Sequence, residues 1–212
     1  MKSIVIWGAG GHAREVHWLC EILGREVVGF LDERPTMRGR TLLGLPVYNG
    51  LHEVIQMRHE VEVVCAGVGD PPLKAKFWQQ TLEAGFIIAG PLIHPSVEVS
   101  RRNHIDTGVV ICAGVTLTVD IQLGRGVILN RNVTVGHDVK LHDFVTVGPG
   151  AVISGNVTVG ELSYIGTLAG IREKLHVGRE VMLAGGAFLT QDMPDECLYA
   201  GVPAVFKKDL RR

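Results

Sequence analysis

The sequence predicts a small Rossmann-like parallel α/β domain over residues 1–90, followed by a left-handed parallel β-helix with a C-terminal tail over residues 91–212. Two observations support this prediction. Residues 3–33 read as a strand, a glycine loop, a helix and a second strand that ends in an acid. From Ile93 to Leu189, every sixth residue is a branched aliphatic. A helix repeats about every 3.6 residues and a strand about every 2, so the second pattern requires another kind of fold.

The first element is the apolar run of residues 3–7, which leads into the loop of residues 8–13, GAGGHA. Apolar residues then recur at helical spacing as far as Leu23, and a second apolar run at residues 26–31 meets Asp32. Bare glycines let the backbone approach a pyrophosphate, and the N-terminus of the following helix favours its negative charge. The acid is placed to accept from ribose or base hydroxyls. The segment therefore predicts a nucleotide site; the alternative is a glycine turn that only packs helix against strand.

The rest of the first half holds a predicted helix near residues 51–58, a strand at 61–66, a helix around 74–84 and a strand at 86–89. Only about four strands fit into this part of the chain, whereas a complete dinucleotide fold has about six. A mononucleotide or a nucleotide sugar is therefore favoured over NAD. Gly90 and Pro91 mark the predicted domain boundary, since proline restricts both its own backbone and that of its predecessor.

The second half repeats every six residues without a change of phase. The first inward series is Ile93, Val99, Ile105, Ile111, Leu117, Leu123, Leu129, Val135, Leu141, Val147, Ile153, Val159, Ile165, Ile171, Val177, Leu183 and Leu189. A second inward position follows four residues later and is mostly small or β-branched, although Asn103, Ser163 and Leu175 fit it less well. Each hexad forms one side of a triangular coil, so 18 residues close a turn and the series gives a little over five coils. Residues 18 apart should therefore stack on one another.

The composition excludes several classes of protein. Twenty-one Lys and Arg against 22 Asp and Glu give a net charge of -1, which does not suggest binding to nucleic acid or to an anionic membrane. The four cysteines lack CxxC pairing, so we expect reduced thiols in a cytoplasmic protein. No apolar run approaches the ~20 residues of a membrane span, and the N-terminus lacks the apolar core of a signal peptide.

Among the nine histidines, His12 and His137 stand out. His12 directly follows the glycine loop, so a ligand on that loop would lie near its imidazole. His137 lies two residues after the inward Val135, where a side chain points outward, and Asp138 follows it. A neighbouring carboxylate can hold one tautomer and raise the basicity of the ring, which suits a general base. Such a pair is more often an ordinary surface pair when it stands alone.

Four segments together carry a resemblance to a known family: 8–12 (GAGGH), 30–33 (FLDE), 136–138 (GHD) and 201–204 (GVPA). With the uninterrupted hexapeptide repeat, the chain resembles the left-handed β-helix acetyltransferases that modify nucleotide-linked amino sugars, and the related sialic acid O-acetyltransferases. The resemblance covers nearly the whole chain. It implies a homotrimer with acetyl-CoA, the acetyl donor, bound along the β-helix between subunits. The sugar nucleotide would bind the N-terminal domain, no metal is implied, and the segment 201–204 should pack near the cofactor cleft.

The resemblance also implies roles for individual residues. His137 would be the catalytic base and Asp138 would tune it. The implied sugar-nucleotide residues are Gly10, Gly11, His12, Asp32, Glu33 and Gly69, and the implied cofactor residues are Thr146, Thr167 and Gly185. Thr167 and Gly185 lie 18 apart, so they should stack, as an extended cofactor requires. At position 146 relatives often carry a histidine that contacts acetyl-CoA.

Other activities remain open at this point. The acceptor could be an amine or a hydroxyl, and the carrier UDP, dTDP or GDP. Hexapeptide helices also build zinc enzymes of the carbonic anhydrase type, and His137 and His142 show an HxxxxH spacing. A third ligand is expected 36 residues before His137, where Arg101 stands, and His104 is out of phase. A further alternative is a non-enzymatic sensor of nucleotide sugars.

Overall fold

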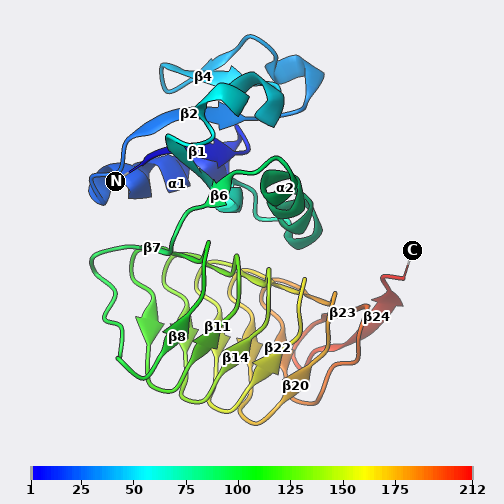
Figure 1. The fold of residues 1–212 in the computed structure, drawn as a ribbon. Helices are drawn as coiled ribbons and strands as arrows, with labels where there is room; N and C mark the ends of the chain where they lie inside the picture. Colours follow the sequence, from blue (N-terminus) through cyan, green and yellow to red (C-terminus); the bar gives the residue numbers. More distant parts are fainter. Residues whose placement is uncertain (1, 212) are drawn as a thin grey trace.

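The computed structural model describes residues 2–211 as an α/β domain that stands on one face of a triangular β-helix (Figure 1). The first part contains β1 (Ser3–Trp7), α1 (Gly11–Ile22), β2 (Val27–Leu31), η1 (Pro35–Met37), β3 (Thr41–Leu42), β4 (Leu45–Tyr48), η2 (Leu51–Met57), β5 (Val61–Val64), η3 (Cys65–Gly67), α2 (Pro71–Glu83) and β6 (Ile87–Ile88). The six strands of this part form one sheet of order β3-β4-β2-β1-β5-β6. Strands β1, β2, β4, β5 and β6 are parallel, which confirms the predicted fold class.

The sheet has six strands, so the expectation of about four was wrong. The missed strands are β3 and β4, an antiparallel hairpin whose β4 extends the parallel sheet beside β2. Its two-residue turn places Leu43 at φ 52° and Gly44 at φ 79°. Asn-Gly or Asp-Gly is the usual signal for such a turn. Because leucine occupies the first turn position and Pro46 stands inside the second strand, where proline is unusual, the sequence hides this hairpin.

Helix α2 begins three residues before the predicted start. Asp70 caps it, since its Oδ1 accepts a 2.8 Å hydrogen bond from Leu73 N, and Pro71 takes the first helical position. The segment near 51–58 is helical as predicted but winds as a 3-10 helix, η2. Within residues 2–211, no helix is long and apolar enough to cross a membrane.

The second part is a β-helix of two-residue strands. These are β7 (Leu92–Ile93), β8 (His104–Ile105), β9 (Val110–Ile111), β10 (Thr116–Leu117), β11 (Gln122–Leu123), β12 (Ile128–Leu129), β13 (Thr134–Val135), β14 (Lys140–Leu141), β15 (Thr146–Val147), β16 (Val152–Ile153), β17 (Thr158–Val159), β18 (Tyr164–Ile165), β19 (Gly170–Ile171), β20 (His176–Val177), β21 (Met182–Leu183) and β22 (Phe188–Leu189). Each strand pairs in parallel with residues 18 positions away, for example Val147 with Leu129 and with Ile165. The predicted 18-residue coil is thus confirmed.

The β-helix has three faces and three corners, which we name by their strands. The domain face holds β7, β9, β12, β15, β18 and β21; the β10 face holds β10, β13, β16, β19 and β22; the β8 face holds β8, β11, β14, β17 and β20. The chain passes from the domain face to the β10 face at the first corner, from there to the β8 face at the second corner, and back at the third corner. Each corner is therefore a stack of residues 18 apart.

The inward series forms the core of the β-helix, with one exception. Ile111 and all members from Leu123 to Leu189 are buried, whereas Ile93, Ile105 and Leu117, nearer the starting end, are half-buried. Val99 is 40% exposed, and residues 94–103 contain no strand. The prediction fails at Val99, in the first coil. The weak-fitting Ser163 is fully buried, and its hydroxyl donates to Gly178 O (3.0 Å) and accepts from Val181 N (3.3 Å).

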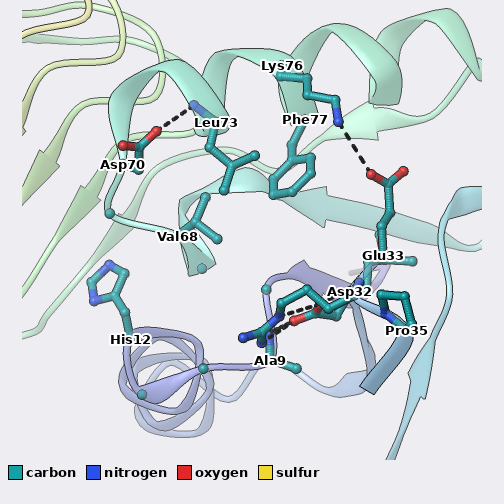
Figure 2. Close-up of a pocket in the computed structure, with 17 residues that line it drawn as sticks. Ala9, His12, Asp32, Glu33, Pro35, Val68, Asp70, Leu73, Lys76 and Phe77 are labelled. Atoms are coloured by element: carbon teal, nitrogen blue, oxygen red, sulfur yellow. Dashed lines mark hydrogen bonds and ion pairs between the residues drawn. The ribbon is translucent and has the colours of Figure 1, made fainter. Parts of the chain in front are cut away.

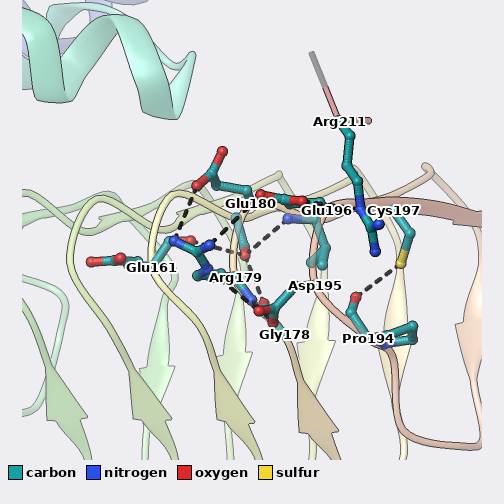
Figure 3. Close-up of polar contacts among 11 residues, drawn as sticks. Glu161, Gly178, Arg179, Glu180, Pro194, Asp195, Glu196, Cys197 and Arg211 are labelled. Carbon is teal, nitrogen blue, oxygen red and sulfur yellow. Dashed lines mark hydrogen bonds and ion pairs between the residues drawn. The ribbon is translucent and has the colours of Figure 1, made fainter. Parts of the chain in front are cut away.

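The tail closes the far end of the β-helix. Strand β23 (Cys197–Ala200) pairs with β21, and β24 (Val205–Asp209) turns back antiparallel to β23. Figure 3 shows Arg179 of the last coil reaching the tail: its Nε lies 3.3 Å from Asp195 Oδ2 and its Nη2 3.7 Å from Glu196 Oε1. The segment 201–204 returns to β22, where Ala204 N donates to Phe188 O at 2.7 Å. The tail thus lies beside the first corner at the last coil of the β-helix.

The two parts of the chain share a buried seam. Leu19 of α1 belongs to the same apolar cluster as Val110 and Ile128 of the domain face. On the other side of the seam, Trp78 of α2 meets Phe144 edge to face, with ring centroids 5.4 Å apart. Strand β6 ends at residue 88 and β7 begins at residue 92. The division into domains at residues 90 and 91 stays a proposal, and the seam fixes the position of the α/β part relative to the corners.

Candidate functional site

A cavity of about 610 Å³ lies at the carboxyl ends of the central strands of the α/β sheet (Figure 2). Its walls come from the loops that follow β1, β2 and β5 and from the first turns of α2, and they comprise Gly8–His12, Leu31–Pro35, Gly67–Asp70, Leu73, Lys76 and Phe77. Crevices at this edge of open parallel sheets are where such folds bind ligands. The six predicted sugar-nucleotide residues, Gly10, Gly11, His12, Asp32, Glu33 and Gly69, all line it.

The glycines of this cavity serve two different purposes. Gly8 has φ +98°, and a Cβ there would come 2.8 Å from Gly67 O, so Gly8 allows the loops after β1 and β5 to touch. A Cβ at Gly10 or Gly69 would meet nothing within 4 Å. These two glycines therefore leave bare backbone at the cavity wall, where a ligand can approach the chain closely.

Asp32 is buried at the base of the cavity and is already fully engaged. Its Oδ2 accepts from Ala9 N (3.1 Å) and Arg34 Nη2 (2.6 Å), and its Oδ1 accepts from Arg34 N (3.0 Å) and Arg34 Nε (2.8 Å). A carboxylate offers about four acceptor positions, and these contacts occupy them. Burial alone would raise the pKa of Asp32, but the hydrogen bonds from Arg34 outweigh it and hold the pKa below its usual value. Asp32 thus anchors the glycine loop and Arg34, and its contact with a ligand stays a prediction.

Glu33 lies on the opposite wall of the cavity, next to α2. Lys76 Nζ lies 3.5 Å from Glu33 Oε2, and Gln80 Nε2 donates to Glu33 Oε1 at 3.4 Å. Arg34 and Lys76 are the cationic residues of the lining, and Asp32, Glu33 and Asp70 are the carboxylates. The side chains around the cavity therefore supply no excess of positive charge.

His12 stands in the first turn of α1 and connects the cavity to the β-helix. Its Nδ1 lies 3.5 Å from Glu15 Oε2, and Glu15 Oε1 lies 2.6 Å from Arg131 Nη1 on the first corner. Burial lowers the pKa of His12 more than Glu15 raises it, so the ring is neutral at physiological pH. Its Nε2 is buried and has no hydrogen-bond partner within residues 2–211. Sequence reasoning missed Glu15 and Arg131; the only signal was the i,i+3 spacing of His12 and Glu15.

His137 and Asp138 follow β13 at the second corner. Asp138 Oδ2 lies 2.7 Å from His137 Nδ1, and Asp138 adopts φ 59°, a conformation that Asp tolerates better than most residues. The imidazole ring lies over Gly155, one coil further on, where any Cβ would press against it. The ring remains exposed. With Nδ1 held by the carboxylate, Nε2 is free to accept a proton.

The predicted cofactor residues occupy two different environments. Thr167 and Gly185 are exposed and stacked on the first corner, where Thr167 O accepts from Gly186 N at 2.8 Å. Thr146 lies instead in β15 on the domain face and is only 1% exposed. Its Oγ1 accepts a 2.9 Å hydrogen bond from Lys74 Nζ, a contact that sequence reasoning missed. This burial argues against a direct contact between Thr146 and a cofactor.

One chain does not bring all the predicted residues together. Arg131, Thr167 and Gly185 share the first corner, and the cavity joins this corner through Glu15. His137 stands at the second corner, across the β10 face, and His142 at the third. In residues 2–211, no group of three or more His, Cys, Asp or Glu is arranged to hold a metal ion.

Comparison with known proteins identifies both parts of the chain. Residues 3–81 match the family model of the PglD N-terminal domain, and residues 120–155 match the bacterial transferase hexapeptide model of six repeats. No curated protein sequence matches the chain.

Among solved structures, a variant of perosamine N-acetyltransferase from Caulobacter crescentus, in complex with CoA and GDP-perosamine, is similar over 99% of this chain and 98% of its own, with 30% identity and a TM-score of 0.90. The acetyltransferase domain of PglB from Neisseria gonorrhoeae FA1090, in complex with acetyl coenzyme A, is 33% identical over 97% of this chain and 99% of its own, with a TM-score of 0.87. WeeI from Acinetobacter baumannii AYE, at 24% identity over 98% of this chain and 100% of its own, shares the fold with a TM-score of 0.85.

Proposed function

Because the chain belongs to the hexapeptide-repeat sugar acetyltransferases, we propose that it transfers the acetyl group of acetyl-CoA to the amine of a nucleotide-linked amino sugar. The observation that carries this proposal is the cavity beside the glycine loop, whose bare Gly10 and Gly69 suit the backbone-bound phosphates of a nucleotide. Gly11, His12 and Glu33 would complete the sugar-nucleotide site. The relative that binds GDP-perosamine makes a GDP-linked sugar the first candidate, and UDP and dTDP are the alternative carriers.

We propose that the working enzyme is a homotrimer, because its site is divided between corners. His137 would approach the cavity and Thr167 only if the second corner of one subunit met the first corner of the next. The β10 face between these corners exposes Val152 and Phe188, which are 47% and 41% exposed, and Leu168 beside them is 69% exposed. An apolar surface of this kind suits burial between subunits. A closed ring gives each subunit one complete site.

His137 would act as the general base. The amine would attack the carbonyl carbon of the acetyl thioester and lose a proton as the amide forms, while the C–S bond breaks and CoA leaves as a thiolate that takes up a proton. His137 Nε2 would accept the proton of the amine, while Asp138 holds the Nδ1–H and stabilises the imidazolium. Thr167 and Gly185 would bind the cofactor along the first corner, and a backbone N–H from a glycine corner would stabilise the developing oxyanion. We propose that the reaction takes place in the cytoplasm; the intracellular supply of acetyl-CoA and the four free cysteines support this location.

The direct test is acetyl transfer by the purified protein. GDP-perosamine and a panel of UDP- and dTDP-linked amino sugars would be incubated with acetyl-CoA, and the released thiol and the product mass measured. We expect one acetyl group per sugar and an amide that survives mild base. A base-labile product would indicate O-acetylation. If no amino sugar of the panel were acetylated, the proposal would be contradicted.

A further inference from the structure

The cavity contains an arginine whose position is set by a buried carboxylate. Arg34 donates to both oxygens of Asp32 in a bidentate pair, at 2.8 Å from Nε and 2.6 Å from Nη2. Ala9 N of the glycine loop donates to the same Oδ2 at 3.1 Å. The guanidinium and the loop backbone thus meet on one oxygen atom, so Arg34 lies within two hydrogen-bond lengths of the loop. Figure 2 shows the carboxylate of Asp32 next to Ala9, with dashed lines reaching it.

A guanidinium has five N–H donors, and Asp32 takes only two of those of Arg34. The Arg34 side chain is 61% exposed, whereas that of Asp32 is 7% exposed. The remaining donors therefore face away from the carboxylate, on the accessible side of the pair. A planar fork held in this way matches the geometry of phosphate oxygens.

The charges around the cavity add a second argument. A nucleoside diphosphate brings at least two negative charges to a lining whose carboxylates already outnumber its cations. Lys76 lies on the far wall beside Glu33, so Arg34 is the cation of the cavity lining on the side of the glycine loop. The N-terminus of α1 favours anions at the same place.

We propose that Arg34 binds the diphosphate of the nucleotide substrate and that Asp32 positions Arg34 instead of contacting the nucleoside. This inference rests on the proposed function. It gives Arg34 a contact with the diphosphate, and it replaces the contact with ribose or base hydroxyls that the sequence predicted for Asp32. It also explains why all acceptor positions of the buried Asp32 carboxylate are occupied by the glycine loop and by Arg34.

Binding measurements on the full-length protein test the assignment without acetyl transfer. Equilibrium dialysis would give the affinities of GDP and UDP, and displacement of the bound diphosphate would give those of guanosine and uridine. Arg34→Ala should weaken diphosphate binding about 10- to 100-fold, the effect of one charge-assisted contact, and change nucleoside binding less than about twofold. The diphosphate affinity of Arg34→Lys should lie between those of the wild type and Arg34→Ala, because lysine keeps the positive charge but lacks the planar guanidinium. Arg38→Ala, an exposed arginine outside the cavity, serves as control and should bind like the wild type.

Asp32→Asn separates the two roles of the acid. If Asp32 only positions Arg34, this variant should lose diphosphate affinity and keep nucleoside affinity, as Arg34→Ala does. Equal losses for GDP and guanosine in either variant, or unchanged GDP binding in Arg34→Ala, would overturn the proposal. A wild-type protein that binds no nucleoside diphosphate would instead refute the proposed function.

Discussion

Lys74 and Thr146 meet in the buried seam between the α/β part and the β-helix, where Lys74 Nζ donates a 2.9 Å hydrogen bond to Thr146 Oγ1. The residues are 72 positions apart, and Lys74 is fully buried. The second acceptor of the amine is Val145 O at 3.4 Å. Burial lowers the pKa of Lys74 well below its usual value, and within residues 2–211 no carboxylate contacts the amine to offset this effect.

Lys74→Met should change how stability depends on pH. The pKa of Lys74 is lower in the folded than in the unfolded protein, so the unfolded state binds the extra proton between these two values. The free energy of unfolding therefore rises with pH across this window, by about 1.4 kcal/mol per pH unit from this group. Urea denaturation from pH 6 to 10 should show that Lys74→Met loses this slope. Lys76→Met, exposed on the same helix, should keep it; a slope unchanged in Lys74→Met would mean that the amine stays protonated in the fold.

His137→Ala should lower kcat roughly 10²–10⁴-fold on the true substrate, because it removes the proposed base. Thermal unfolding and acetyl-CoA affinity should stay close to those of the wild type, since the ring is exposed. Asp138→Asn should lower kcat less, because the ring remains and only its charged partner is lost. Steady-state kinetics would measure both, with His142→Ala at the third corner as control. Wild-type turnover by His137→Ala would assign the base to another residue.

Glu15→Gln should raise KM for the nucleotide sugar and leave KM for acetyl-CoA unchanged. Glu15 links His12 to Arg131, and its charge raises the pKa of His12 against the larger effect of burial. Its removal should free the ring and raise KM for the nucleotide sugar several-fold, with KM for acetyl-CoA unchanged. Glu21→Gln is the matched control, because Glu21 contacts His17 on the same helix at the same 3.5 Å. Equal effects from the two variants would show that the contact is a surface ion pair without a role at the site.

Ile153 and Val152 are adjacent in β16 but point in opposite directions, so aspartate should act differently at each. Ile153 is 1% exposed, and an unpaired buried carboxylate costs several kcal/mol against a total stability of about 5–15 kcal/mol. Ile153→Asp should therefore unfold the surrounding coils, seen as a loss of circular dichroism. Val152→Asp should fold and lower the mass from three times 23.0 kDa towards that of one chain. A folded trimer of Val152→Asp would place the subunit contact elsewhere.

The hexapeptide repeat could be predicted from the sequence because each aliphatic residue in it indicates a side chain that points into the β-helix. An aliphatic residue every six positions can be buried inside a triangular coil, and every member of the series from Leu123 to Leu189 is buried in this way. The contacts of the cavity were not readable in the same way. That Asp32 is occupied by Arg34, or that Lys74 meets Thr146, depends on how loops and helices pack, and no local pattern encodes it. The hairpin of β3 and β4 was hidden for a local reason, since Leu43 stands where a turn usually carries asparagine or aspartate.

Arg131, Thr167 and Gly185 stack on one corner, so the number of coils between them sets the distances between these residues along the axis of the β-helix. Two coils separate Arg131 from Thr167 and one more separates Thr167 from Gly185. Because parallel strands lie about 4.8 Å apart, Arg131 and Gly185 are roughly 14 Å apart along the axis. An insertion of 18 residues between them would lengthen this reach by one step and keep every side chain on its corner. An insertion of six would carry everything beyond it to a neighbouring corner, so length variants of this protein that keep their activity should differ by whole coils.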